Sequence, residues 1–165
     1  MRRVSMLVWL FVVLGLVRAA AGGPGSVEVL FTPTVVTEAV ALKDGLKVGR
    51  LESSNALSLV GVSAERKKAY TDKIAGVTTV VIIGEDALKA VADMEFSSSV
   101  VLVNATGDTA AKGRVVRVFD GATAPADAVA VSSAGAVKDL VVAGKELSFK
   151  GRATTVVQGV LDAFR

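Results

Sequence analysis

The stretch Val77–Met94, which reads VTTVVIIGEDALKAVADM, decides the fold class of this chain. Its first part is rich in Val, Ile and Thr and shows no polar alternation, which is typical of a strand buried on both faces. Gly84 ends this run, and Glu85 and Asp86 open a predicted helix, where acidic side chains suit the positive end of the helix dipole. A buried strand followed at once by a helix indicates a parallel α/β sheet.

The same succession of short apolar runs and helical patterns extends along the chain in both directions. Strands are predicted from their apolar composition at 27–31, 77–83, 100–103 and 115–119, with further short runs at 57–62, at 126–131 (a strand or helical turn) and at 146–149 (an edge strand). Helices are predicted from apolar stripes and cap residues at 35–46, 64–74, 85–94, 134–143 and 153–164. The sequence therefore predicts a single three-layer α/β domain over residues 27–165, with a mostly parallel, Rossmann-like sheet of about four or five strands.

The N-terminal segment 1–21 has the layout of a secretory signal peptide. Two arginines precede an uncharged apolar run from Val4 to Val17, and three alanines before Gly22 offer a cleavage position. This run is shorter than the roughly 18 residues that a membrane span needs, so we expect cleavage, with a retained anchor as the alternative. We expect the exported chain to be periplasmic or extracellular, without a permanent membrane span, and to begin with a flexible lead at 22–26.

The composition excludes several classes of function. The chain has 165 residues, of which 52% are hydrophobic and 21% charged, and this is too apolar for a disordered tail. It contains no Cys and no His, so disulfides, thiolate nucleophiles, imidazole bases and the common zinc ligand sets are excluded. Loss of Arg2, Arg3 and Arg18 with the predicted signal peptide would cancel the formal net charge of +3. We therefore expect no nucleic-acid partner and no cofactor.

Polar and small residues follow several of the predicted strands. In an open parallel sheet, ligands bind beyond the carboxyl ends of the strands. At these ends the chain carries Thr34, Gly84, Glu85, Asn104 and Asp120, which we predict to form a ligand-binding rim. Each of these residues also suits a structural role as a helix cap or in a turn, which is the alternative interpretation.

A metal site is a second hypothesis for the same rim. Glu85, Asp86 and Asp120 are carboxylates at neighbouring strand ends, and carboxylate oxygens are the ligands that Mg²⁺ and Ca²⁺ prefer. Such a site would make the protein a cation-dependent hydrolase, because carboxylate acid-base chemistry needs neither Cys nor His. The glycine-rich segment 107–113 lacks the spacing of a phosphate loop, and no serine lies in a nucleophile motif. The balance favours binding over catalysis.

The stretches Val80–Val91, VVIIGEDALKAV, and Val100–Asn104, VVLVN, together resemble one lobe of the periplasmic substrate-binding proteins of ABC importers. That family closes two α/β lobes around a small solute, so the resemblance implies that Gly84, Glu85 and Asn104 lie at a binding cleft. The chain is too short for two lobes, and the resemblance therefore implies a single-lobe relative.

Taken with this resemblance, the sequence predicts an exported, non-enzymatic domain. Its expected partner is a small solute or an envelope protein, and pairing with a second copy would supply the other half of a cleft. A structural or assembly protein of the cell envelope, with no ligand, is a further alternative beside the hydrolase.

Overall fold

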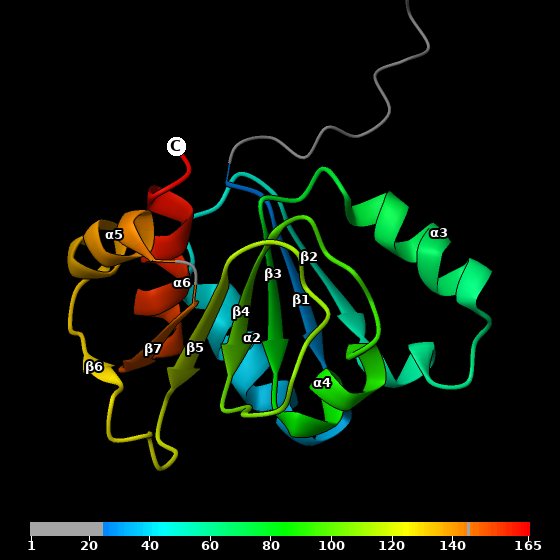
Figure 1. The fold of residues 1–165 in the computed structure, drawn as a ribbon, viewed down its shortest axis with the longest axis horizontal. Helices are drawn as coiled ribbons and strands as arrows, with labels where there is room; N and C mark the ends of the chain where they lie inside the picture. Colours follow the sequence, from blue (N-terminus) through cyan, green and yellow to red (C-terminus); the bar gives the residue numbers. More distant parts are fainter. Residues whose placement is uncertain (1–24, 145) are drawn as a thin grey trace, which may run out of the picture.

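The computed structural model describes residues 25–144 and 146–165, and its centre is a seven-stranded, all-parallel sheet (Figure 1). The strand order is β2-β1-β3-β4-β5-β7-β6. The strands are β1 (Val27–Phe31), β2 (Leu51–Asn55), β3 (Thr79–Ile83), β4 (Ser99–Val103), β5 (Val115–Phe119), β6 (Val129–Ala130) and β7 (Glu146–Lys150). The α-helices are α2 (Val36–Gly45), α3 (Ala64–Ile74), α4 (Glu85–Val91), α5 (Ala134–Ala143) and α6 (Ala153–Asp162), and the 3-10 helices are η1 (Pro33–Val35) and η2 (Ala56–Leu59).

The predicted α/β class and parallel sheet are confirmed, and the predicted count of four or five strands is wrong. The polar strand β2, LESSN, was not predicted, because it is an edge strand whose residues are partly or fully exposed. The apolar run 57–62 is not a strand, since η2 occupies its first half. The strand β7 was predicted at an edge, but it lies between β5 and β6.

Alternate residues of the central strands face two separate hydrophobic clusters. Val81 and Ile83 of β3 pack on one side of the sheet, with buried residues of α2, α5 and α6. Val80 and Ile82 pack on the other side, with buried residues of η2, α3 and α4. Because both sides of β3 are covered, its sequence shows the unbroken apolar run from which the parallel sheet was predicted.

The connection from β4 to β5 contains no helix within the described residues. Its chain, residues 104–114, instead lies against the segment after α4, where the Lys112 amide donates to the Phe96 carbonyl (2.9 Å). Arg117 of β5 and Ser148 of β7 are register partners, and both point to the side of the sheet opposite α5 and α6, where the connection from β4 to β5 provides no helix. The sequence of β7, ELSFK, shows the polar alternation expected of a strand with one solvated face.

The N-terminal predictions fall largely outside the described residues. The signal peptide at 1–21 and residues 22–24 of the predicted lead are not described. Gly25 and Ser26 are buried, and the Ser26 hydroxyl accepts a hydrogen bond from the Thr78 amide (3.2 Å). The last two residues of the predicted lead therefore lie against the start of β3 in the structure. Within the described part of the chain, no helix is long and apolar enough to cross a membrane.

Candidate functional site

The chain adds β2 on one side of β1 and then β3 on the other side, so the strand order reverses between β1 and β3 while all strands stay parallel. The chain leaves β1 for α2 on one side of the sheet and leaves β3 for α4 on the other side. Gly84 makes the turn from β3 into α4 with φ of +84°, a backbone conformation that favours glycine. In open α/β sheets, the crevice at such a reversal is the usual ligand position.

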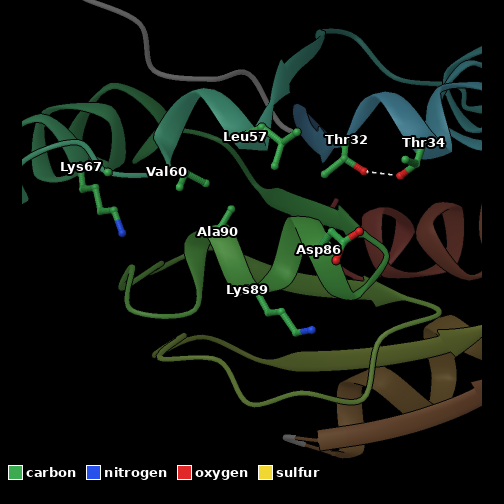
Figure 2. Close-up of a pocket in the computed structure, with 9 residues that line it drawn as sticks. Thr32, Thr34, Leu57, Val60, Lys67, Asp86, Lys89 and Ala90 are labelled. Atoms are coloured by element: carbon green, nitrogen blue, oxygen red, sulfur yellow. Dashed lines mark hydrogen bonds between the residues drawn. The ribbon is translucent and has the colours of Figure 1, made fainter.

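A pocket of about 390 Å³ opens beside this reversal, between η2 and α3 on one side and α4 on the other (Figure 2). We call it the β1 groove. Its lining residues are Thr32, Thr34, Leu57, Val60, Gly61, Lys67, Asp86, Lys89 and Ala90. Leu57 is 47% exposed and Val60 is 60% exposed, so the wall that η2 and the following loop provide is apolar and open to solvent.

Two lysines bring positive charge to the β1 groove. Lys67, from α3, is only 19% exposed, and its Nζ lies 2.7 Å and 2.9 Å from the two carboxylate oxygens of Asp93. The hydrogen bond from Lys67 lowers the pKa of Asp93. Lys89, from α4, is exposed and makes no ion pair with any residue in 25–144 or 146–165.

Among the predicted rim residues, Thr34 lies in the β1 groove together with Asp86 of the alternative metal set. The Thr34 hydroxyl is hydrogen-bonded to that of Thr32 (2.8 Å). Gly84 forms the turn between β3 and α4, and its amide donates to the Val103 carbonyl (2.8 Å). The groove therefore contains part of the predicted rim, while the other members lie elsewhere.

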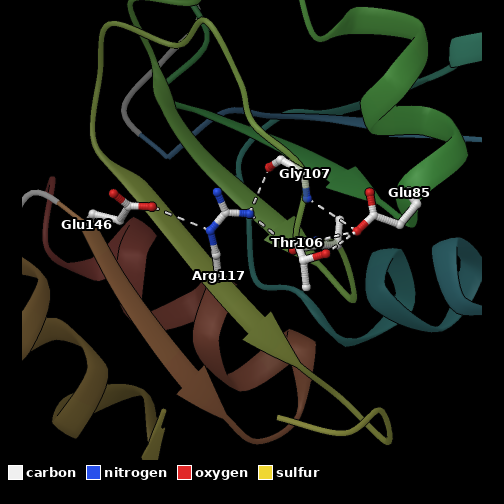
Figure 3. A network of polar contacts seen from close by, with 6 residues as sticks. Glu85, Thr106, Gly107, Arg117 and Glu146 are labelled. Atoms are coloured by element: carbon white, nitrogen blue, oxygen red, sulfur yellow. Dashed lines mark hydrogen bonds and ion pairs between the residues drawn. The ribbon is translucent and has the colours of Figure 1, made fainter. Parts of the chain in front are cut away.

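The Glu85 carboxylate accepts hydrogen bonds from the connection between β4 and β5 (Figure 3). Its Oε1 accepts hydrogen bonds from the Thr106 amide, the Thr106 hydroxyl (2.8 Å) and the Gly107 amide (3.3 Å). These bonds, first of all the one from the Thr106 amide, hold the pKa of Glu85 below its usual value. Arg117 donates to the Ala105 and Gly107 carbonyls (3.2 and 3.1 Å), so both of these charged residues fasten the connection from β4 to β5.

Asn104 and Asp120 join the ends of β4 and β5, and we call this pair the brace. The Asn104 Nδ2 donates to the Asp120 carbonyl (3.1 Å), and its Oδ1 accepts from the Asp120 amide (2.9 Å). Asn104 has φ of +52°, in the left-handed region that Asn tolerates better than most residues. Asp120 Oδ2 accepts from the Ala153 amide (2.8 Å) and thereby caps the first turn of α6.

A second, smaller pocket of about 220 Å³ lies at the brace, between α2 and α6. Its lining includes both brace residues and Arg152, Leu42 and Val103. The hydrogen-bonding atoms of Asn104 and one carboxylate oxygen of Asp120 are already occupied by the backbone. For these two residues the structural interpretation is therefore the one that the geometry supports.

The predicted carboxylate metal site is not formed. Glu85 turns to the connection after β4, and Asp120 turns to α6, while Asp86 lines the β1 groove. Among residues 25–144 and 146–165, no group of three or more acidic side chains is placed to hold a metal ion. Hydrogen bonds within the fold direct Glu85 and Asp120 to different parts of the chain, so the three carboxylates do not converge.

The lysines and the apolar wall of the β1 groove were not predicted from the sequence. Of the basic cluster 66–68, Lys68 lies on the solvated face of α3, where its Nζ pairs with Asp72 one turn later (2.6 Å). Lys67 precedes the buried Ile74 by two helical turns and therefore lies on the inner side of α3. That spacing was a signal available in the sequence. Comparisons of the chain with protein-family models, with curated proteins and with solved structures found no match.

Proposed function

We propose that the protein is a binding protein that takes a small solute in the β1 groove. One observation carries this proposal: the groove lies at the reversal of strand order and keeps an apolar wall and a lysine without an ion pair among the described residues. Small-ligand sites in proteins are concave, largely apolar and supplied with a few polar groups, and they begin at about 300 Å³.

Physical reasons favour occupation of this groove. Covering apolar surface is favourable by about 25 cal/mol per Å², and Leu57 and Val60 leave about half of their surface uncovered. In the described chain, the side chains of the polar lining groups bond only as Thr32 with Thr34 and as Lys67 with Asp93, and a ligand can cover Leu57 and Val60 without breaking either interaction. The brace pocket offers less, because a ligand of Asn104 there would have to replace two hydrogen bonds that hold the fold.

We further propose that the protein acts outside the cytoplasm as a Rossmann-like, single-lobe relative of ABC-importer substrate-binding proteins. The signal-peptide layout of residues 1–21 supports export. The stretch Val80–Val91, which carries part of the resemblance, forms β3, the Gly84 turn and α4, and α4 contributes Asp86, Lys89 and Ala90 to the groove lining. Of the residues that the resemblance implies for a cleft, Gly84 directly precedes α4, while Glu85 and Asn104 bond within the fold and lie outside the groove lining.

A pair of matched variants tests the proposal. Val60→Trp fills the groove, whereas Val142→Trp on α5 introduces the same side chain at an equally exposed position far from it, since the two valines are 60% and 59% exposed. Ligand-observed NMR with a library of small solutes should give hits that Val60→Trp abolishes and Val142→Trp retains. An absence of hits, or hits that Val60→Trp leaves intact, would contradict the proposal.

A further inference from the structure

The two ends of the β1 groove carry different polar groups. Figure 2 shows Lys67 at one end, beside Val60, and Asp86 with Thr34 at the other end. The apolar side chains of Leu57, Val60 and Ala90 lie between these ends. The groove therefore presents a lysine that is paired with Asp93, then an apolar stretch, then an anion with hydroxyl groups.

Lys67 is prepared to bind an anionic group. Its ammonium has three donors, and the two oxygens of Asp93 take two of them, so one donor remains for a ligand. Asp93 also fixes the direction of this long side chain, which reduces the conformational entropy that binding would cost. Lys89 adds positive charge along the same groove.

The opposite end of the groove calls for a hydrogen-bond donor. An ionised Asp86 side chain can only accept hydrogen bonds, and it makes none with a side chain or backbone amide in the described residues. One hydrogen bond joins the Thr32 and Thr34 hydroxyls, which leaves one hydroxyl hydrogen as a donor and leaves acceptor capacity on both oxygens. An ammonium group complements this end, and its charge makes the hydrogen bonds stronger than those of a neutral donor.

We propose that the β1 groove takes a short zwitterionic solute, with a carboxylate at the Lys67 end, an apolar middle against Leu57, Val60 and Ala90, and an ammonium at the Asp86 end. This inference rests on the proposed function of the groove. Each of these three groups of the solute contacts one part of the lining, so a solute that lacks any one of the groups should bind more weakly.

Four six-carbon probes test the assignment by isothermal titration calorimetry: 6-aminohexanoate, hexanoate, hexylammonium and 1-hexanol. We expect 6-aminohexanoate to bind most tightly and 1-hexanol at least about tenfold more weakly, because hydrogen bonds to charged groups contribute most. Lys67→Met should weaken the binding of 6-aminohexanoate and hexanoate but not of hexylammonium. Asp86→Asn should weaken 6-aminohexanoate and hexylammonium but not hexanoate. Lys68→Met, on the neighbouring residue outside the groove, should change none of these affinities.

The outcomes separate this inference from the proposed function. If 1-hexanol binds as tightly as 6-aminohexanoate, or if neither Lys67→Met nor Asp86→Asn has a selective effect, the zwitterion assignment is overturned and the groove remains a solute site. If no probe binds while library hits are lost in Val60→Trp, the assignment is again overturned alone. If no probe binds and the library gives no hits, both are overturned.

Discussion

The β1 groove and the brace lie on the same edge of one sheet, and both follow buried strands that end in polar residues. At the brace, Asn104 and Asp120 bond to the backbone of neighbouring strands and of α6. At the groove, Asp86 and Lys89 line open space instead. The comparison teaches that a polar residue at a strand end is a ligand candidate only if the fold does not itself use its hydrogen bonds.

The connections after the strands account for this difference. The connection from β4 to β5 lacks a helix within the described chain, so side chains such as Glu85 and Arg117 fasten it. The connection from β2 to β3 contains η2 and α3. Ile74 is the single fully buried residue of α3, so this helix stands away from the sheet edge and leaves room for the groove.

The largest expected effect comes from breaking the brace at Asn104. Asn104→Ala removes both amide hydrogen bonds and places a residue that disfavours positive φ at +52°, so we expect the free energy of unfolding to fall by about 2–3 kcal/mol. Asn104→Gly loses the same bonds but tolerates the backbone, and should cost less. Urea unfolding measures both, and equal stability of wild type and Asn104→Ala would contradict the brace.

Loss of the α6 cap should have the next largest effect. Asp120→Ala removes the acceptor of the Ala153 amide, and replacement of such a cap costs about 1–2 kcal/mol of stability. Asp127→Ala is the control, because Asp127 is exposed and its side chain makes no hydrogen bond or ion pair in the described chain. That control should stay within about 0.5 kcal/mol of wild type in the same unfolding experiment.

A smaller effect is expected at Glu85, and it depends on pH. Folding lowers the pKa of Glu85, so its contribution to stability is complete above the unfolded-state pKa and is lost as the pH falls through the folded-state pKa. Wild type should therefore lose more thermal stability than Glu85→Gln between pH 6 and pH 3, which is about the pH range in which carboxylates titrate. Thr106→Val removes one of the donors to Glu85 and should lie between them. Identical pH profiles for all three proteins would contradict the assigned role.

The smallest effect on stability is expected in the groove. Lys67→Met breaks only a surface ion pair with Asp93, whose carboxylate is 68% exposed, and such pairs contribute about 0–1 kcal/mol. The comparison therefore predicts nearly unchanged urea unfolding for this variant. A loss as large as that of Asn104→Ala would show that Lys67 holds the fold, as the brace does.

Much of the fold could be predicted from the sequence, because strands that are buried on both faces consist of unbroken apolar runs. The helices at 64–74 and 134–143 begin and end where predicted, with Ser63 and Ser133 as their caps. The edge strand β2 carries no such signal, since most of its side chains are polar. Sheet edges are solvated, and local composition cannot distinguish their strands from loops.

The site could be predicted only in part. Strand ends place Thr34, Gly84 and Asp86 correctly at the reversal of strand order. The roles of Glu85 and Asp120 depend on Thr106 and Ala153, which lie 21 and 33 residues away along the chain. No local pattern reports such distant partners, so the sequence could not distinguish Glu85 and Asp120 from the residues that line the groove.

We propose that the β1 groove takes up a solute and that the brace pocket does not, because Asn104 and Asp120 already bond to the backbone there. Methyl NMR tests it most directly, because Leu57 and Val60 report on the groove and Leu42 and Val103 report on the brace pocket. Titration with 6-aminohexanoate, and separately with the pooled solute library, should shift the methyl signals of Leu57 and Val60 and leave those of Leu42 and Val103 in place. Shifts confined to Leu42 and Val103, or no shifts at Leu57 and Val60 in either titration, would contradict it.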